Sequence, residues 1–378
     1  MTARTRNRTT RRTDESYYVA SQWQMMWWKF RRHRLAVVAG PLLAAIYLVA
    51  LFADFVAPYG VSTRFPDYLS APPNRIRLLG AGSGSADAAG GAYVYGLRVE
   101  RHPHTLRKIY EPDRERRYAV RFFGQGEEYR FWGIFKTRAH LFVPDEEGAP
   151  LFLFGTDRLG RDLFSRVLYA ARISLSIGLV GVLLSTVLGV LLGGVAGYFG
   201  GVVDRVVMRL VDLLASIPTI PLWMGLAAAV PRQWSVLTTY FAITLILSLV
   251  GWTHLARVVR GRFLSLREED FVMAAVVAAA SERAIIFGHL LPSFFSYVIV
   301  SLTLAVPGMI LGETALSFLG LGIQPPAVSW GTLLQDAQNF QAVSRQPWLL
   351  IPCLFVVLTV LLYNFLGDGL RDAADPYS

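Results

Sequence analysis

Long apolar stretches dominate this chain, and polar segments of different lengths separate them. Six stretches are long enough to cross the ~30 Å hydrocarbon core of a bilayer as helices. The pattern therefore predicts an all-α polytopic membrane protein with six transmembrane helices. We expect these spans to cover residues 35–58, 173–203, 213–231, 235–256, 293–320 and 349–367.

Residues 59–165 contain no such stretch, and we expect them to form a small domain between the first and second spans. Residues 92–99 and 118–123 alternate between apolar and polar positions, which is typical of strands. Two glycines follow at residues 124–126, and then an aromatic run covers residues 129–135. We therefore predict a strand-rich insertion containing a β-hairpin with its turn at residues 124–126.

Residues 1–34 form a basic and aromatic N-terminal segment. Residues 1–16 are rich in Arg and Thr without apolar periodicity, which predicts disorder. Residues 17–34 mix aromatic with basic side chains, as in segments that lie among lipid head groups, although a disordered tail remains an alternative. The first span exceeds the roughly 7–15-residue apolar core of a signal peptide, so we expect an uncleaved anchor.

Basic residues in the short loops are distributed unevenly between the two sides of the membrane. One side carries the basic residues of the N-terminal segment, Arg205, Arg209, the five arginines of residues 257–292, and Arg371. The other side carries only Arg232 and Arg345. By the positive-inside rule, both termini and residues 257–292 are predicted to be cytoplasmic. Because most basic charge lies beside apolar spans, the net charge of +10 does not indicate nucleic-acid binding.

Composition and motifs give no sign of catalysis. The chain has only three lysines, none of them follows a glycine, and a phosphate-binding loop of the GxxxxGK[ST] type is therefore absent. The six histidines are scattered without a metal-binding motif, and the single Cys353 cannot form an internal disulfide. We expect no metal, no cofactor and no catalytic residue in this chain, so any ATP would be hydrolysed by another subunit.

Residues 257–292 interrupt the apolar pattern with a charged lead-in and a short block of Ala and Val. Such a block favours a helix, and the Ser281-Glu282-Arg283 triplet that follows predicts a second short helix after a break. A simple connection would be much shorter, so we interpret this segment as a cytoplasmic surface that another protein grips.

Small residues and prolines mark two of the predicted spans. Gly189, Gly193 and Gly197 repeat at intervals of four in the second span, a spacing that lets a neighbouring helix approach closely. Pro218 and Pro221 predict a kink or break in the third span.

Glu313 is the best candidate for a polar group facing a transport path, because few ionisable residues occur within the spans. The alternative is an interfacial helix end with its carboxylate in water, where such a residue costs little.

The octet Gly-Thr-Asp-Arg-Leu-Gly-Arg-Asp precedes the second span. Thr156 or Asp157 is expected to cap the helix that follows, with the remaining charges solvated or paired. The residues of this outer motif are Gly155, Thr156, Asp157, Gly160, Arg161 and Asp162.

Three sequences carry a resemblance to a known family: this octet, the run ETALSFLGLG at residues 313–322, and NFLGDGLRD at residues 364–372. Together they resemble the inner-membrane permease subunits of bacterial dipeptide/oligopeptide ABC importers, of the OppC/DppC type. The insertion and the His-Leu-Phe at residues 140–142 are similar to the microcin C subgroup. The resemblance implies the type I ABC importer permease fold, with its transmembrane domain over residues 172–368.

Residues 257–292 resemble the cytoplasmic coupling segment of this family, which is called the EAA loop. In the family, this loop docks in a cleft of the ATPase. Met273 stands where Glu is usual, and the usual glycine falls at Ala278 or Ala279. The resemblance implies that the coupling residues are Met273, Ala274, Ala275, Ala278, Ala279, Ser281, Glu282, Arg283 and Pro292.

The resemblance implies a subunit that moves peptides or peptide-like solutes across the bacterial inner membrane by alternating access. Its expected partners are a homologous permease, two ATPases that bind ATP and Mg, and a periplasmic binding protein. Two alternatives remain open from the residues alone. A stand-alone channel or intramembrane enzyme would need an ionisable site at depth, and a receptor or scaffold would bind its ligand through the external insertion.

Overall fold

The fold is described from a computed structural model, in which residues 22–78, 91–101, 103, 108–146 and 148–375 are described. The predicted disorder of residues 1–16 lies outside these ranges. Two helices follow each other at the N-terminal end, α2 (Gln22–Phe30) and α3 (Arg34–Leu51), and the one-turn α4 (Ala53–Val56) ends the first span.

The described part of the chain has five helices that are long and apolar enough to cross a membrane. A sixth span is possible by length if the pair α6 (Gly201–Ser216) and α7 (Thr219–Ala228), which is bent by 89°, crosses as one unit. The bend lies at Ile217 and Pro218, as the prolines predicted. The other spans are α3, α5 (Leu163–Phe199), α8 (Val236–Leu266), α12 (Phe295–Phe318) and α15 (Ile351–Ala374).

Helices α5 and α8 each extend ten residues past one end of the predicted span, and α15 extends seven residues past Gly367. Helix α5 begins at Leu163, ten residues before the expected start, because the Asp162 carboxylate caps it by accepting from Ser165 N at 2.8 Å. Helix α8 continues ten residues beyond Ala256 to Leu266. Three arginines in these extensions, Arg166, Arg172 and Arg260, pair with aspartates, which lowers the cost of extending the helices past the apolar stretch.

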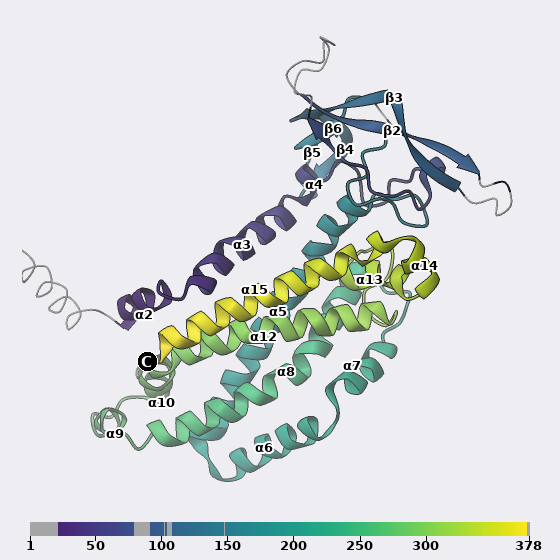
Figure 1. The fold of residues 1–378 in the computed structure, drawn as a ribbon. Helices are drawn as coiled ribbons and strands as arrows, with labels where there is room; N and C mark the ends of the chain where they lie inside the picture. Colours follow the sequence, from purple (N-terminus) through teal and green to yellow (C-terminus); the bar gives the residue numbers. More distant parts are fainter. Residues whose placement is uncertain (1–21, 79–90, 102, 104–107, 147, 376–378) are drawn as a thin grey trace, which may run out of the picture.

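Helix α5 lies at the centre of the bundle, and α3, α8 and α12 pack against it (Figure 1). Helix α15 packs on both α3 and α12. The core between these helices is apolar and includes the buried Ile177, Leu247 and Ile310. The outward faces carry exposed leucines such as Leu183 and Leu245, as expected for helices surrounded by lipid.

The insertion contains two antiparallel sheets. One has the order β1-β2-β3-β6, from β1 (Arg77–Leu78), β2 (Ala92–Arg101), β3 (Lys108–Phe122) and β6 (Phe142–Pro144). The other is the pair β4 (Gln125–Phe131) and β5 (Phe135–Ala139).

The predicted hairpin with its turn at residues 124–126 is wrong. The strand before that turn, β3, pairs with β2 and β6, whereas the hairpin is formed by β4 and β5. Its turn lies at residues 132–134, where Ile134 N donates to Phe131 O at 3.0 Å. The two segments at residues 92–99 and 118–123 are strands, and they pair with each other around Val94 and Tyr118.

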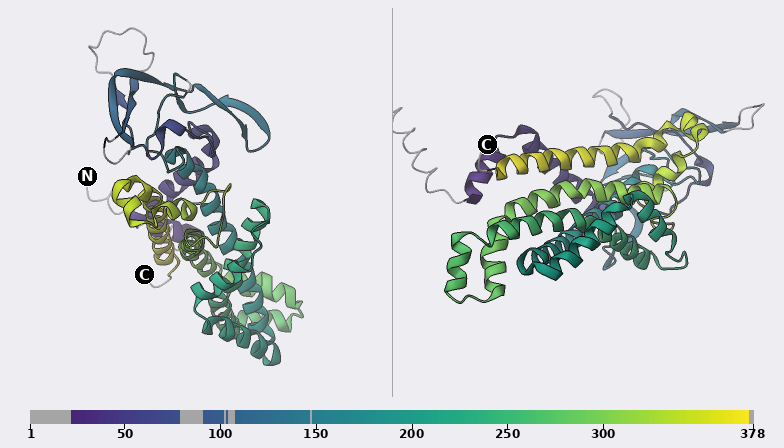
Figure 2. Two further views of the ribbon diagram at one scale, coloured as in Figure 1. Left: turned by 90° about the vertical axis from the view of Figure 1, so that its right-hand side faces the viewer. Right: turned by 90° about the horizontal axis from the view of Figure 1, so that it is seen from below.

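The strand domain lies at one end of the bundle, whereas α2, α9 (Asp270–Val277), α10 (Glu282–Ile285) and the C-terminal end lie at the other (Figure 1). Figure 2 shows α9 and α10 projecting beyond the ends of the long helices. The domain joins the bundle through its own apolar core, which includes Tyr59, Val94 and Phe152. The molecule therefore presents two separate ends, one rich in strands and one formed by short helices.

Candidate functional site

The coupling segment, residues 267–294, connects α8 to α12 and contains the two predicted short helices. Helix α9 ends at Val277, and α10 begins at Glu282 after a four-residue break. Ser281 caps α10, its hydroxyl accepting from Ala284 N at 3.3 Å. A wider turn over Ile286–Leu290 then leads into α12. The break turns the chain back, so that both ends of the segment are joined to long helices of the bundle.

One side of the coupling segment is anchored in a small core of its own. Val272 of α9, Ile285 of α10 and Leu290 are buried against Phe263 near the end of α8 and against Phe294. Burial of several large apolar side chains gives this core a stabilisation of several kcal/mol. The segment is therefore attached firmly to α8 and α12.

Another part of the α9 surface is apolar and uncovered. Val277 is 84% exposed, and Met273 and Val276 are each 51% exposed. A contiguous apolar face of this kind usually marks a contact with another protein. Of the nine coupling residues implied by the resemblance, Ala275 is half-buried and the remainder are exposed.

Ala279 in the break has a left-handed backbone, with φ of +52°. This conformation suits glycine and is strained for alanine. It is one of the two positions, Ala278 and Ala279, at which the resemblance implies a glycine. The backbone therefore keeps the geometry that a glycine would allow, although this sequence has none there.

Most of the outer motif at residues 155–162 is buried, so solvation is wrong for Asp157 and Asp162, whereas Arg158 is exposed. Pairing, the other alternative, holds for Asp157. Asp157 is fully buried and accepts from Arg161 N at 3.0 Å and Arg161 Nε at 2.7 Å, and it also pairs with Arg166. The helix cap is Asp162 rather than Thr156 or Asp157. Thr156 instead accepts from Ala71 N at 2.7 Å. The contacts of Asp157 are local in sequence, whereas Thr156 bonds to a residue 85 positions away.

Two glycines let this motif fit tightly against the segment after α4. Gly155 and Gly160 have φ of +76° and +73°. A Cβ atom on Gly160 would lie 2.3 Å from Phe65 O, so no other residue fits without movement of the backbone. Burial raises the pKa of Asp162 to about 7. The motif is a polar junction that ties the strand domain to the start of α5.

Glu313 of α12 is buried completely, so the alternative of a carboxylate in water is wrong. Its carboxylate accepts from Ser174 Oγ of α5 at 2.9 Å and from Ser317 Oγ at 2.6 Å. Ser174 Oγ in turn accepts from Trp330 N at 3.1 Å, and Ser317 Oγ accepts from Ile323 N at 2.9 Å. Glu313 thus joins α5, α12 and the segment after α12. A role in a transport path stays a prediction.

Gly189, Gly193 and Gly197 lie where α5 crosses α8. A Cβ atom on Gly193 would lie 2.4 Å from Ala256 O, and one on Gly197 would lie 2.8 Å from Arg260 O. The missing side chains therefore permit direct backbone contact between the two helices. This contact continues down to the part of α8 that leads into the coupling segment.

Two cavities open beside α8 and α12. One, of about 310 Å³, lies between α5, α7, α8 and α12, and the other, of about 700 Å³, reaches Arg262 and Arg371 near the coupling segment. Both are lined by His254, Ser301 and Ala305, so they adjoin each other. Together they form a partly polar hollow from mid-bundle to the end that carries the coupling segment.

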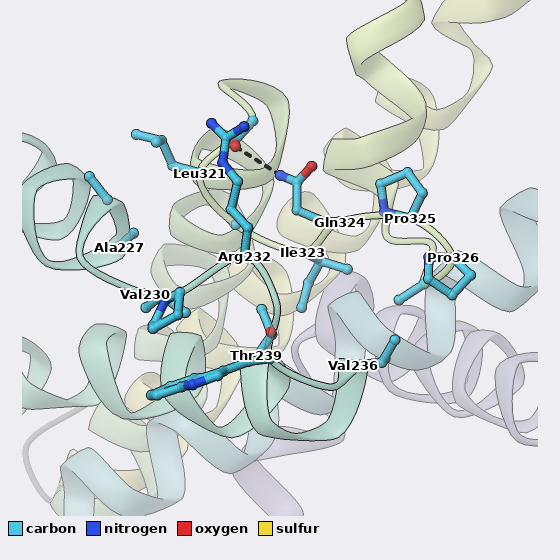
Figure 3. A pocket seen from close by; sticks show the side chains of 16 residues that line it. Ala227, Val230, Arg232, Val236, Thr239, Leu321, Ile323, Gln324, Pro325 and Pro326 are labelled. Atoms are coloured by element: carbon cyan, nitrogen blue, oxygen red, sulfur yellow. Dashed lines mark hydrogen bonds between the residues drawn. The ribbon is translucent and has the colours of Figure 1, made fainter.

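A further cavity, of about 220 Å³, lies at the opposite end between the α7–α8 connection and the segment after α12 (Figure 3). Arg232 and Gln324 extend on the same side of it, and Gln324 Nε2 donates to Gly320 O at 2.8 Å. Within the described ranges, no group of three or more His, Cys, Asp or Glu side chains is arranged to hold a metal ion.

Comparison with known families decides the class of protein. The profile for the binding-protein-dependent transport system inner membrane component matches residues 189–377. The chain belongs to this family. The N-terminal transmembrane domain of oligopeptide transport permease C matches residues 21–73. The protein is therefore a permease subunit of an ABC importer, whose ATPase is a separate subunit, and a multi-pass protein of the inner membrane.

Curated relatives match about three-fifths of this permease. The oligopeptide transport system permease protein OppC of Escherichia coli K12 is 46% identical over 235 residues, which are 62% of this chain and 74% of that protein. OppC of Haemophilus influenzae is 43% identical over 62% of this chain and 72% of its own. OppC of Bacillus subtilis is 38% identical over 59% and 71%.

A solved chain of the MetNI methionine ABC transporter in an inward-facing conformation also matches, at a TM-score of 0.42 and 19% identity. It covers 56% of this chain and 97% of that chain, a similarity too distant to add to the assignment.

The residues that line the hollow of the permease were not predicted from the sequence. His254, Thr253 and Ser301 are polar positions inside apolar helices, and polar residues at membrane depth often mark a solute path. That signal was present in the sequence, but which helix faces carry it depends on how α8 and α12 pack.

Proposed function

We propose that this permease imports peptides or peptide-like solutes by alternating access, as one half of a pair with a homologous permease. Two ATPases that bind ATP and Mg drive the pair from the cytoplasm, and a periplasmic binding protein delivers the solute. Both termini and the coupling segment are cytoplasmic in this proposal. The peptide class is supported by the names of the relatives, each an oligopeptide permease.

The observation that carries the proposal is the exposed apolar face of α9, Met273, Val276 and Val277, at the far end from the strand domain. An ATPase that covers this face would bury apolar surface and hold the segment. The core beneath α9 includes residues of α8 and the start of α12. Movement of the ATPase would therefore be passed to two helices at once.

The hollow beside α8 and α12 supports the second half of the mechanism. Both helices line it, so a displacement at their cytoplasmic ends would change its width. Its position at the coupling end corresponds to an inward-open passage. To shift a 1:99 balance of two states to 99:1, nucleotide binding must favour one state by ~5.5 kcal/mol.

ATP-dependent uptake by the reconstituted complex tests the proposal. The complete complex is purified in mild detergent through a tag on this chain, its chains are identified, and it is placed in liposomes with binding protein and a labelled oligopeptide. We expect ATPase and a second permease to co-purify, and uptake to require ATP. Uptake that proceeds without ATP would instead indicate a channel and would overturn the proposal.

A further inference from the structure

Large exposed aromatic and aliphatic side chains occur at the end of β3 and around the β4–β5 turn. Ile134 is 76% exposed and Phe123 is 74% exposed. Phe122, Phe135 and Trp132, their neighbours in the sequence, are 57%, 55% and 49% exposed. We call these five residues the aromatic face. Such a patch in water would promote aggregation, so some apolar or amphipathic surface is expected to cover it.

Two residues of the aromatic face hold a backbone conformation that their side chains disfavour. Phe123 and Trp132 have φ of +55° and +49°. Glycine and asparagine are the ordinary residues at such turn positions, and a bulky residue there is an outlier. Both side chains remain largely exposed, although the Phe123 ring lies 6.2 Å from that of Phe55 and Trp132 contacts the end of α3. Strain kept at an exposed position points to a functional contact.

The aromatic face is fixed at the end of the first span. Trp132 Nε1 donates to the carbonyl of Leu51, the last residue of α3, at 3.0 Å. The Trp132 ring also lies 5.8 Å from the ring of Phe52. Arg172 Nε donates to the carbonyl of Ala50 at 2.8 Å, and these two donors cap the end of α3.

Figure 1 shows β4 and β5 beside α4, at the end of α3 that is remote from α2. The level at which an apolar helix ends is the head-group region of the bilayer, where Trp and other amphipathic rings are enriched. The hairpin turn is therefore held at the depth at which such side chains meet lipid. Charge adds little, because Lys136 and Arg138 of β5 are both within 4 Å of Glu128.

We propose that the aromatic face contacts lipid head groups and upper acyl chains of the outer leaflet, beside α3. The β4–β5 hairpin is then a second membrane contact for the insertion, and it sets the height and tilt of the strand domain above the bilayer. The occupant is lipid because the face is continuous with the lipid-facing span α3. This proposal depends on α3 crossing the membrane and not on peptide transport.

Depth-dependent quenching in nanodiscs tests this contact. The full-length chain carries Cys353→Ala, to remove the exposed native thiol, and a single cysteine at Ile134 labelled with the dye NBD. The nanodiscs contain phosphatidylethanolamine and phosphatidylglycerol, with or without lipids bearing doxyl at carbon 5 or 12. The control carries the dye at Ile109, which is 40% exposed at the other end of β3.

We expect the doxyl lipids to quench NBD at position 134 at least twice as strongly as at position 109, and carbon 5 to quench more than carbon 12. High salt should not change the result, because the contact is apolar. Equal quenching at the two positions would overturn the proposal. So would a signal at position 134 that ignores the doxyl lipids and changes only when the binding protein is added, since the face would then contact protein.

Discussion

Arg260 of α8 and Asp204 of α6 form a two-point ion pair, in which Arg260 Nη2 lies 2.5 Å from Asp204 Oδ2. Asp204 lies in the first turn of α6, and Arg260 lies six residues before the end of α8. The pair thus fastens the bent α6–α7 unit to the helix that carries the coupling segment. Motion imposed on that segment would be passed to α6 as well as to α12.

Asp204→Asn should therefore weaken the link between ATP hydrolysis and transport. We expect ATPase activity of the complex to persist while uptake falls several-fold. A double-mutant cycle with Arg260→Gln should give a coupling energy of about 1 kcal/mol, since the pair is partly screened by solvent. The matched control is Asp212→Asn, which breaks the exposed pair with Arg257. An equal loss of uptake in both variants would contradict the special role of Asp204.

Ala279→Gly should stabilise the coupling segment. The left-handed φ of +52° costs alanine roughly 1–2 kcal/mol, and glycine avoids most of that cost. We expect the variant to resist proteolysis of the segment longer than the parent. The neighbouring Ala278 has φ of −74°, so Ala278→Gly should act in the opposite direction, by about 0.5–1 kcal/mol. Destabilisation by Ala279→Gly would contradict a left-handed backbone at Ala279.

Gly193→Ala should separate α5 from α8. Its methyl group would lie 2.4 Å from Ala256 O, which is backbone and cannot move aside alone. We expect the melting temperature of the detergent-solubilised chain to fall, at a cost of about 1–3 kcal/mol. Gly261→Ala is the control on α8, because nothing lies within 4 Å of its added Cβ atom and alanine favours helix. Equal melting temperatures for Gly193→Ala and the parent would contradict the close contact.

Asp162 should make the free energy of unfolding fall as pH rises, whereas a paired carboxylate usually makes it rise. Burial raises its folded-state pKa from 3.8 to about 7. Below pH 3.8 the carboxyl is protonated in both states, and between pH 3.8 and 7 only the unfolded chain ionises. Stability should therefore fall as pH rises from about 4 to 7, and the penalty should be complete above pH 7.

Asp162→Asn tests this assignment, because asparagine caps helices well and cannot ionise. The variant should show a flatter dependence of melting temperature on pH between 4 and 7 and should melt higher than the parent above pH 7. In the parent, the buried Oδ1 of Asp162 has no hydrogen-bond partner. The asparagine amide would put a neutral polar group in that position, as the protonated acid does. An unchanged pH profile would mean that another group titrates in this range.

The sequence predicted the spans and the break at Pro218, because apolar length and proline act locally. The predicted helix ends were wrong, because each predicted span ended where the apolar stretch meets a charged residue. The charges beyond those points, Arg166 and Arg260, are paired with Asp157 and Asp204. Asp157 lies in the loop before α5, and Asp204 lies in another helix than Arg260, so these pairs were not evident from composition.

The strand domain and the outer motif were also mispredicted, because their structures depend on contacts with other segments. The glycines at residues 124 and 126 indicated a turn, but pairing of β3 with β2 and β6 is set by long-range contacts. The burial of Asp157 depends on packing against the segment that includes Tyr68 and Ala71, whereas the octet by itself is as polar as a surface loop. The coupling segment was predictable because helix, break and helix are local features.

The central claim is that the apolar face of α9 is where the ATPase holds this subunit. The most direct measurement is the amount of ATPase retained on the purified permease when Val277 is replaced by Arg. Phe340→Arg is the matched control, because both side chains are 84% exposed and Phe340 lies on α14 (Phe340–Arg345) at the opposite end. We predict that Val277→Arg loses at least nine-tenths of the bound ATPase while Phe340→Arg keeps it. Full retention by Val277→Arg would contradict the claim.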